Sequence, residues 1–295
     1  MKTGFSLSPG GLLLPYHMGA LHSLQQNGFL DPSTLIAGSS AGSIAAMAHG
    51  CNVHPYQVLE GTISISETCQ QKYGRAHGKL LKELKHHMNS LVGEKEFLYL
   101  QEHSNIGIAY TQVFPFHESH LQTEFENRQD LFRAVSYSCM FPFFTAETPW
   151  LMDIRRDRKL PRLMMDGIFS VPWDRFGCPQ LEGMTDKVDR TVAISVMPQH
   201  LLKWCMNGMG SFSRENVISP SLGGDEKNHD LVVHLGRLAV FPSSRKELTQ
   251  LFDLGERDAE LWCIDEKKLQ REKDRRRRRI RNKVLNKYQY ATATV

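Results

Sequence analysis

The sequence lacks the cysteine patterns that indicate a zinc site or a disulfide scaffold. Its six cysteines include no CxxC pair in 295 residues, so a reducing compartment is the default expectation. The chain also has no uninterrupted run of about 18 apolar residues, which argues against a membrane-spanning helix. The opening stretch, MKTGFSLSPGG, contains no long apolar region, so we expect no secretory signal and a cytoplasmic protein.

The composition is that of an ordinary globular protein, with 41% hydrophobic and 23% charged residues. Disordered and collagen-like classes are therefore excluded. The formal net charge of +4 hides an uneven distribution, because Lys267 to Lys287 hold 12 Lys and Arg against 2 Asp and Glu. The rest of the chain is mildly acidic. We predict one domain over residues 1–265 and a basic tail over residues 266–295.

Hydrophobic periodicity predicts strands that alternate with helices near the N-terminus, which is typical of a layered α/β domain. We expect strands at residues 4–8, 34–37, 106–113, 160–165 and 191–196. We expect helices from Pro15 to about Asn27 and over residues 41–49, 56–71, 79–91, 128–138 and 241–268.

Gly38-Ser39-Ser40-Ala41-Gly42 is a GxSxG motif between a predicted strand and a predicted helix. A serine on such a sharp turn projects its hydroxyl above the sheet, where it can act as a nucleophile. Gly38 and Gly42 lack side chains, so strand and helix can pack closely there. The helix N-terminus beneath Ser40 offers N–H groups to a developing oxyanion. The alternative is a small-residue helix start in which Ser40 is only an N-cap.

A serine nucleophile needs a base, and the sequence leaves two arrangements open. A Ser–His–Asp hydrolase would draw on His200, His229 or His234, which follow the serine. However, an α/β-hydrolase usually has several strands before its nucleophile, and Ser40 follows only two predicted ones.

Three blocks of the sequence resemble the patatin-like phospholipases, and the resemblance is nearest to the branch that contains adipose triglyceride lipase and adiponutrin. The blocks are SLSPGGLLLPYHMGAL with IAGSSAG, then DLFRAVSYSCMFPFF, then MMDGIFSVP, in the family's order. The resemblance implies a three-layer α/β/α domain with a mostly parallel sheet. It also implies hydrolysis of carboxylic esters in acylglycerols or phospholipids, with no cofactor.

The resemblance further implies a Ser–Asp dyad without histidine. Ser40 matches the family's nucleophile, and Asp166, followed by Gly167, matches the proton acceptor. Asp166 would take the Ser40 proton, an acyl-enzyme would form, and water would then release the acid. The backbone N–H groups of Gly10 and Gly11, in the turn after the first strand, are the expected oxyanion hole.

The sequence departs from the family's motifs at two points. It has PGGLLL where the family has a glycine-rich turn, and Pro9 contributes no N–H. It has Asp166-Gly167-Ile168 where the family has DGG or DGA. A second alternative is therefore a catalytically impaired protein that binds lipid surfaces.

The expected partner is a lipid substrate at a membrane or lipid-droplet surface, with the protein peripherally attached. The run Arg275–Arg279 could contact anionic lipid. No aromatic residues interleave this run, which disfavours nucleic acid. The apolar segments 141–152 and 201–212 could dock to lipid. His117 and His120 could share a helix face, but no third ligand accompanies them, so we assign no metal.

Overall fold

The computed structural model describes residues 2–103, 105–154, 160–171, 175–181, 188–198, 216–220 and 229–292, and the side chains of 229, 230, 279, 280 and 282–292 lie outside this description. The strands are β1 (Thr3–Leu7), β2 (Ile36–Ser39), β3 (Ile106–Phe114), β4 (Glu118–Gln122), β5 (Leu151–Asp153), β6 (Arg162–Met165), β7 (Arg190–Ile194) and β8 (Val217–Ile218). The α-helices are α1 (Leu14–Gln26), α2 (Ala41–Gly50), α3 (Pro55–Thr68), α4 (Leu80–Leu91), α5 (Glu94–His103), α6 (Arg128–Ser138), α8 (His229–Val240) and α9 (Arg245–Thr292). Short helical turns are η1 (Gly11–Leu13), η2 (Cys69–Tyr73) and η3 (Gly167–Ser170).

The strands form one mixed sheet in the order β5-β6-β3-β2-β1-β7-β8, with β4 paired to β3. The central strands β3, β2, β1, β7 and β8 pair in parallel, whereas β4, β5 and β6 are antiparallel. The carboxyl ends of β1 and β2 therefore lie at one edge, where Leu7 pairs with Gly38. β3 continues past this edge to Phe114, since its Ala109 already pairs with Ser39.

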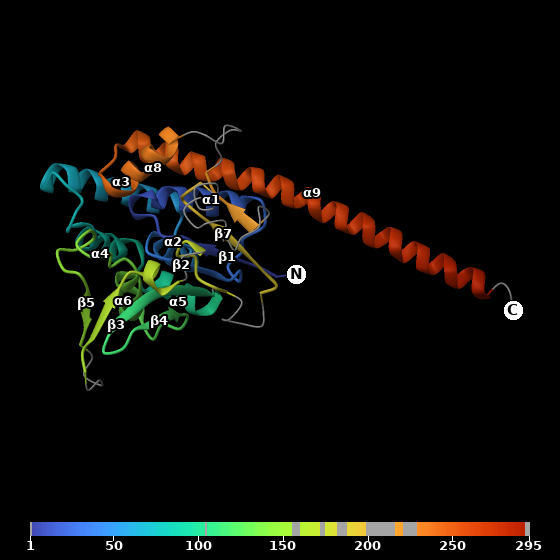
Figure 1. Cartoon of the computed structure of the whole chain (residues 1–295), viewed down its shortest axis with the longest axis horizontal. Coiled ribbons are helices and arrows are strands. Elements are labelled where there is room, and N and C mark those ends of the chain that lie inside the picture. The colour runs from blue at the N-terminus through green and yellow to red at the C-terminus, as the bar shows by residue number, and fades with distance from the viewer. Residues whose placement is uncertain are drawn as a thin grey trace.

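Helices lie against the sheet (Figure 1), and buried apolar side chains form the core between them. The rings of Phe5 in β1 and Trp262 in α9 lie 6.2 Å apart, and Leu7 lies directly under Gly42 of α2. The opposite side of β1 contacts the segment 175–181, where the Ser6 hydroxyl donates to the Pro179 carbonyl at 2.7 Å. The mostly parallel central sheet and the packed helices confirm the predicted α/β/α class.

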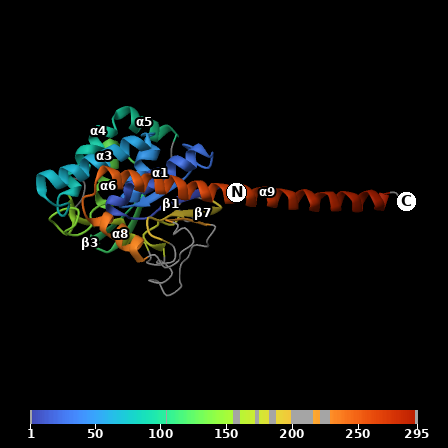
Figure 2. The ribbon, with the colours of Figure 1, turned by 90° about the horizontal axis from the view of Figure 1, so that it is seen from above.

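α9 is a single helix of 48 residues that begins beside α8 and runs along α1. Tyr16 donates to Asp258 at 3.1 Å near the start of α1, and Lys267 donates to Asn27 at 2.8 Å at its end. Beyond Lys267 the helix leaves the body of the molecule, as Figure 2 shows. The predicted helix 241–268 is therefore wrong at both ends. The domain boundary at residue 265 falls inside α9 and stays a prediction.

The strands and helices expected around the GxSxG motif are confirmed, although several boundaries shift. β2 begins at Ile36 and reaches Ser39, and α6 has the predicted bounds. The sequence analysis missed α5, α8, β4, β5 and β8. In the described part of the chain, no helix is both long enough and apolar enough to cross a membrane.

Candidate active site

Ser40 occupies a strained turn between β2 and α2. Its φ of 52° and ψ of −121° lie in a region that side chains rarely adopt. A Cβ at Gly38 would clash with the backbone of Gly42, and a Cβ at Gly42 would clash with Leu7. The two motif glycines therefore allow the close packing of strand and helix that forces this turn.

Three side chains hold the backbone of Ser40, and the sequence analysis missed all of them. The Ser40 amide donates to the Ser138 hydroxyl at 2.8 Å. The Ser40 carbonyl accepts from the Ser43 hydroxyl at 2.6 Å and from the Cys139 thiol at 3.4 Å. Burial raises the pKa of the Cys139 thiol well above its usual range, so it stays protonated. Ser138 is the last residue of α6, and Cys139 follows it as the C-cap. In the sequence, only their position within the block DLFRAVSYSCMFPFF could have pointed to a role at the site.

Asp166 lies at the end of β6, where it caps η3. Its Oδ1 accepts from the Ile168 amide at 2.9 Å, and its backbone amide donates to the Met140 carbonyl at 2.9 Å. A Cβ on Gly167 would clash with the Ala109 carbonyl and lie 2.6 Å from Ser39 Cβ. Glycine at position 167 therefore lets this turn pack closely against β2, which ends one residue before Ser40, and against β3.

The Asp166 carboxyl is buried, with 1% of its surface exposed. Burial raises the pKa of Asp166 to about 7, while hydrogen bonds from the Ile168 amide and from the Ser40 side chain act to lower it. No described residue donates a hydrogen bond of ordinary distance and angle to the other carboxyl oxygen, Asp166 Oδ2. The structure thus brings Ser40 and Asp166 together across 126 sequence positions, and leaves one carboxyl oxygen able to accept a proton.

The predicted oxyanion turn, with Gly10 and Gly11, lies beside Ser40. Gly11 lines the same cavity as Ser40 and has a φ of +56°, while Gly10 precedes η1 and its carbonyl accepts from Leu13 at 3.0 Å. His17, which the sequence analysis did not single out, supports the turn. Burial lowers the pKa of His17 to about 4, so the ring is neutral and Nε2–H donates to the Ser8 carbonyl at 2.8 Å.

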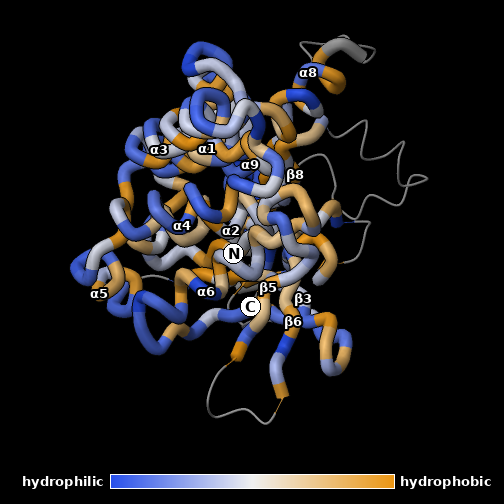
Figure 3. Tube along the Cα trace, turned by 90° about the vertical axis from the view of Figure 1, so that its left-hand side faces the viewer, coloured by the Kyte–Doolittle hydropathy of each residue, from blue (hydrophilic) through white to orange (hydrophobic). Residues whose placement is uncertain are grey.

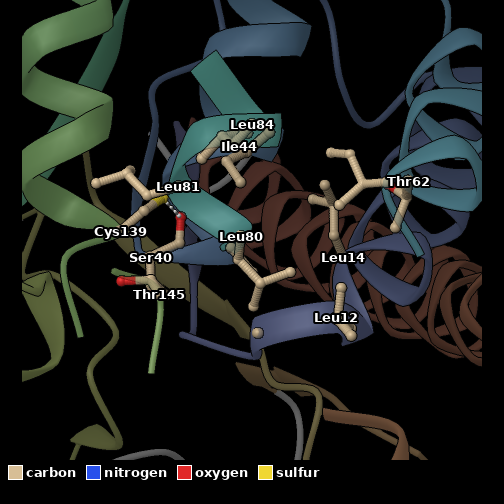
Figure 4. Close-up of a pocket in the computed structure, with 13 residues that line it drawn as sticks. Leu12, Leu14, Ser40, Ile44, Thr62, Leu80, Leu81, Leu84, Cys139 and Thr145 are labelled. Atoms are coloured by element: carbon tan, nitrogen blue, oxygen red, sulfur yellow. Dashed lines mark hydrogen bonds between the residues drawn. The ribbon is translucent and has the colours of Figure 1, made fainter. Parts of the chain in front are cut away.

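Ser40 opens into a small apolar cavity of about 60 Å³, which we call the site cavity (Figure 4). Its walls come from η1 and helices α1 to α4, together with two residues beyond α6. The lining residues are Gly11, Leu12, Leu14, Ser40, Ala41, Ile44, Thr62, Ile65, Leu80, Leu81, Leu84, Cys139 and Thr145. Leucine, isoleucine and alanine make up most of this lining.

The remaining candidate residues lie away from this cavity or outside the described residues. His117 precedes β4 and His120 lies in β4, a strand, so the shared helix face considered for them is wrong. His234 is exposed on α8, whereas His200, the His229 side chain and the segment 201–212 lie outside the described residues. No group of three metal-ligand side chains gathers in the described part of the chain.

The family model for patatin-like phospholipases matches residues 5–176, which include Ser40 and Asp166. No curated protein sequence gives a significant match.

Two solved structures are similar in fold. VipD from Legionella pneumophila aligns at 12% identity and a TM-score of 0.43, over 90% of this chain and 67% of VipD. Human GIVD cytosolic phospholipase A2 aligns at 12% identity and a TM-score of 0.49, over 90% of this chain and 59% of its own length. Because the family model covers more than half of the sequence, the chain belongs to the patatin-like phospholipase family.

Proposed function

We propose that the chain hydrolyses carboxylic esters of acyl lipids, either acylglycerols or phospholipids, through Ser40 and Asp166. Membership of the family supports a lipid ester hydrolase. The observation that carries the finer proposal is a strained serine at the head of an apolar cavity with a buried carboxyl behind it, whose pKa is about 7. A carboxylate with this pKa is a far stronger base than an exposed aspartate.

The proposed reaction has two balanced steps. Asp166 takes the proton from Ser40 Oγ as Oγ bonds to the ester carbonyl carbon. The ester C–O bond then breaks, and the leaving alcohol takes the proton from Asp166. In the second step water gives a proton to Asp166 and its oxygen to the acyl carbon. Ser40 leaves with that proton, and the fatty acid is released.

Backbone N–H groups are the proposed oxyanion hole. Gly10 and Gly11 are the candidates in the first turn, and the N-terminus of α2 adds positive dipole at Ser40. Each such donor contributes about 3 kcal/mol to transition-state stabilisation. The neutral His17 ring fixes the Ser8 carbonyl and thereby orients this turn. Pro9 reduces the number of donors, which keeps the catalytically impaired lipid binder as the second candidate.

The Ser–His–Asp alternative receives less support. The described lining of the site cavity contains no histidine, and His234 is exposed. The other two histidines considered as the base in this alternative are His200 and His229, and their side chains lie outside the described residues.

A rim of exposed aromatic side chains supports docking to a lipid surface at the cavity mouth. Phe141 stacks on Phe169 with ring centroids 5.8 Å apart, and its amide donates to Thr145, which lines the cavity. Phe143 and Trp150 in the same loop are 65% and 42% exposed. We define these four aromatic residues as the mouth rim. Figure 3 shows hydrophobic segments at the ends of β5 and β6, and Ile154 and Leu160, which lie next to these two strands in the sequence, are exposed.

Two finer expectations remain proposals alongside this one. The three sequence blocks support the adipose triglyceride lipase and adiponutrin branch. The mouth rim supports peripheral attachment to a membrane or a lipid droplet.

Serine labelling tests the proposal directly. Purified chain is treated with a fluorophosphonate probe, and fatty-acid release is measured from triacylglycerol and phospholipid emulsions. We expect Ser40→Ala to abolish both signals and Asp166→Asn to lower release at least a hundredfold, since one proton-transfer group contributes about that much. Ser136→Ala is the matched control, because Ser136 is buried and bonds within α6 to the Phe132 carbonyl. Full labelling of folded Ser40→Ala would remove the nucleophile from this proposal.

A further inference from the structure

A groove lies between α4, α6 and the edge strand β5, apart from the site cavity. Figure 3 shows these three elements beside one another. The groove has a volume of about 280 Å³, against about 60 Å³ for the site cavity, and the two share no lining residue. We call it the α4–α6 groove. Its volume approaches that of ordinary small-molecule sites.

Two antiparallel helices form the long walls of the groove. The Leu81 amide, early in α4, donates to the Thr145 carbonyl beyond the end of α6 at 2.8 Å. The Val92 carbonyl, just after α4, accepts from Arg128 at the start of α6 at 2.9 Å. The lining positions are 129, 132, 133, 136 and 137 on α6 and 85, 88 and 89 on α4. Because steps of three and four keep residues on one face of a helix, the groove runs along both helices.

The polar lining of the groove offers positive charge and hydrogen-bond donors. Lys85 and Arg133 are its charged side chains, and no acidic residue belongs to its described lining. The amides of Asn89 and Gln129 lie on the same two faces. Arg133 donates to Asp130 at 3.0 Å, whereas no carboxylate among the described residues pairs with Lys85, whose pKa is lowered by partial burial. An anion in the groove would complement both cations.

Apolar side chains form most of the remaining lining. Met88 and Phe132 are buried on the two helices, whereas Met152 of β5 is exposed. Leu151 also lines the groove, and it directly follows Trp150 of the mouth rim. The two cations therefore share the groove with apolar surface that reaches solvent at the edge of the sheet. A small inorganic anion would leave this surface uncovered, whereas a phospholipid carries phosphate and hydrocarbon together.

We propose that the α4–α6 groove binds the headgroup of an anionic phospholipid from a membrane surface. Lys85 and Arg133 donate to its phosphate oxygens. The Asn89 and Gln129 amides donate to its remaining polar oxygens, and the first part of its chains lies against Met152. The groove is separate from the nucleophile, so this lipid is a ligand that is bound without being cleaved. The proposal therefore holds or fails independently of hydrolysis.

The test is titration calorimetry of the full-length chain with dihexyl-ether phosphatidylglycerol below its micelle concentration. The ether bonds of this lipid cannot be hydrolysed as esters. We expect Lys85→Gln to weaken binding at least tenfold, because a hydrogen bond to a charged group is lost. Met152→Glu, at an exposed position of the groove, should weaken it similarly by placing a negative charge beside the phosphate. Lys82→Gln is the matched control, since Lys82 is exposed on α4, lies outside the groove lining and carries the same charge.

Two further ligands distinguish the sources of the phosphate. Glycerol 3-phosphate should bind more weakly than the ether lipid, and equal affinity would overturn the membrane source. Dihexyl-ether phosphatidylcholine should also bind more weakly, and equal affinity would overturn recognition of an anionic headgroup. Native affinity in Lys85→Gln, or an equal loss in Lys82→Gln, would overturn the groove as the site. Lys85→Gln should still cleave a short soluble ester at the native rate, because Lys85 does not line the site cavity.

Discussion

Among the described residues, no cation lowers the pKa of Asp166. Burial favours the protonated acid, and two hydrogen bonds, from the Ile168 amide and the Ser40 side chain, partly restore the carboxylate. The balance keeps the pKa of Asp166 near 7. A base with a pKa near 7 is half ionised at neutral pH, so it can accept a proton from a serine hydroxyl and then donate that proton to a leaving alcohol.

This balance predicts the pH dependence of hydrolysis. Only ionised Asp166 can accept the Ser40 proton, so kcat/KM should rise about tenfold per pH unit below about pH 7 and level off above it. The measurement is hydrolysis of a short, soluble ester between pH 5.5 and 9, with Ser136→Ala giving the same curve. Because asparagine does not titrate, residual activity of Asp166→Asn should lose this slope. A native profile that is flat from pH 6 to 8 would contradict Asp166 as the base.

The sequence was informative about residues that belong to short local motifs. Ser40 and the two glycines around it could be identified because the turn they form needs small residues at fixed spacing. Ser138 and His17 could not be identified this way. Ser138 reaches the Ser40 amide across 98 positions, and His17 acts through the backbone of Ser8. Neither contact leaves a periodic signal in the sequence.

At the level of elements, apolar periodicity predicted the buried helices and strands and failed at the surface. β4 has exposed and half-buried residues only and pairs with β3 alone, so its sequence ESHLQ lacks the alternation of a half-buried strand. α5 buries just Phe97 and Leu100. The helix was predicted to end at Lys268 because the sequence after it is polar and basic, yet Arg and Lys are good helix formers and α9 continues to Thr292.

The contact that ties α9 to the sheet is a buried ion pair. Arg190 of β7 and Glu266 of α9 lie 2.8 Å apart, with 10% and 7% of their side chains exposed. Arg190 also donates to Asn216 at 2.6 Å and lies 5.7 Å from the Trp262 ring. Removing the carboxylate would break this ion pair and leave the Arg190 guanidinium buried without it.

We therefore expect Glu266→Gln to lower the free energy of unfolding by about 3 kcal/mol, the scale for breaking a buried pair from one side. Asp265→Asn is the matched control on the neighbouring residue. Its pair with Lys268 is exposed, with 74% and 65% of the two side chains accessible, so its effect should stay within about 1 kcal/mol. Urea unfolding of both variants gives the comparison. Equal stability of the two would show that the Arg190–Glu266 pair contributes little to holding α9 on the sheet.

Over the whole molecule, the mouth rim and the basic run of α9 lie in separate parts of the fold. α1 starts just after the oxyanion turn, and α9 runs beside it from Tyr16 to Asn27 before leaving the body. Figures 1 and 2 show the free part of α9 extending beyond the N-terminal side, away from α8. The mouth rim belongs to the loop that leads from α6 to the edge strand β5, and to η3. The mouth rim and Arg275–Arg279 thus belong to different elements of the structure.

The two contacts should therefore be separable in the full-length chain. Replacing Arg275–Arg279 with five glutamines should weaken binding to anionic phosphatidylserine vesicles, since each exposed arginine near the surface contributes about 1 kcal/mol. Raising the salt concentration should imitate this change. Hydrolysis of a neutral triacylglycerol emulsion should persist.

The double variant Phe143→Ser and Trp150→Ser should behave in the opposite way, keeping vesicle binding and losing emulsion hydrolysis, while a short soluble ester is still cleaved. Vesicle flotation and fatty-acid release measure the two effects. If the glutamine variant lost emulsion hydrolysis as well, α9 would have to bend back towards the cavity mouth. The extended helix would then not be the form that acts on lipid.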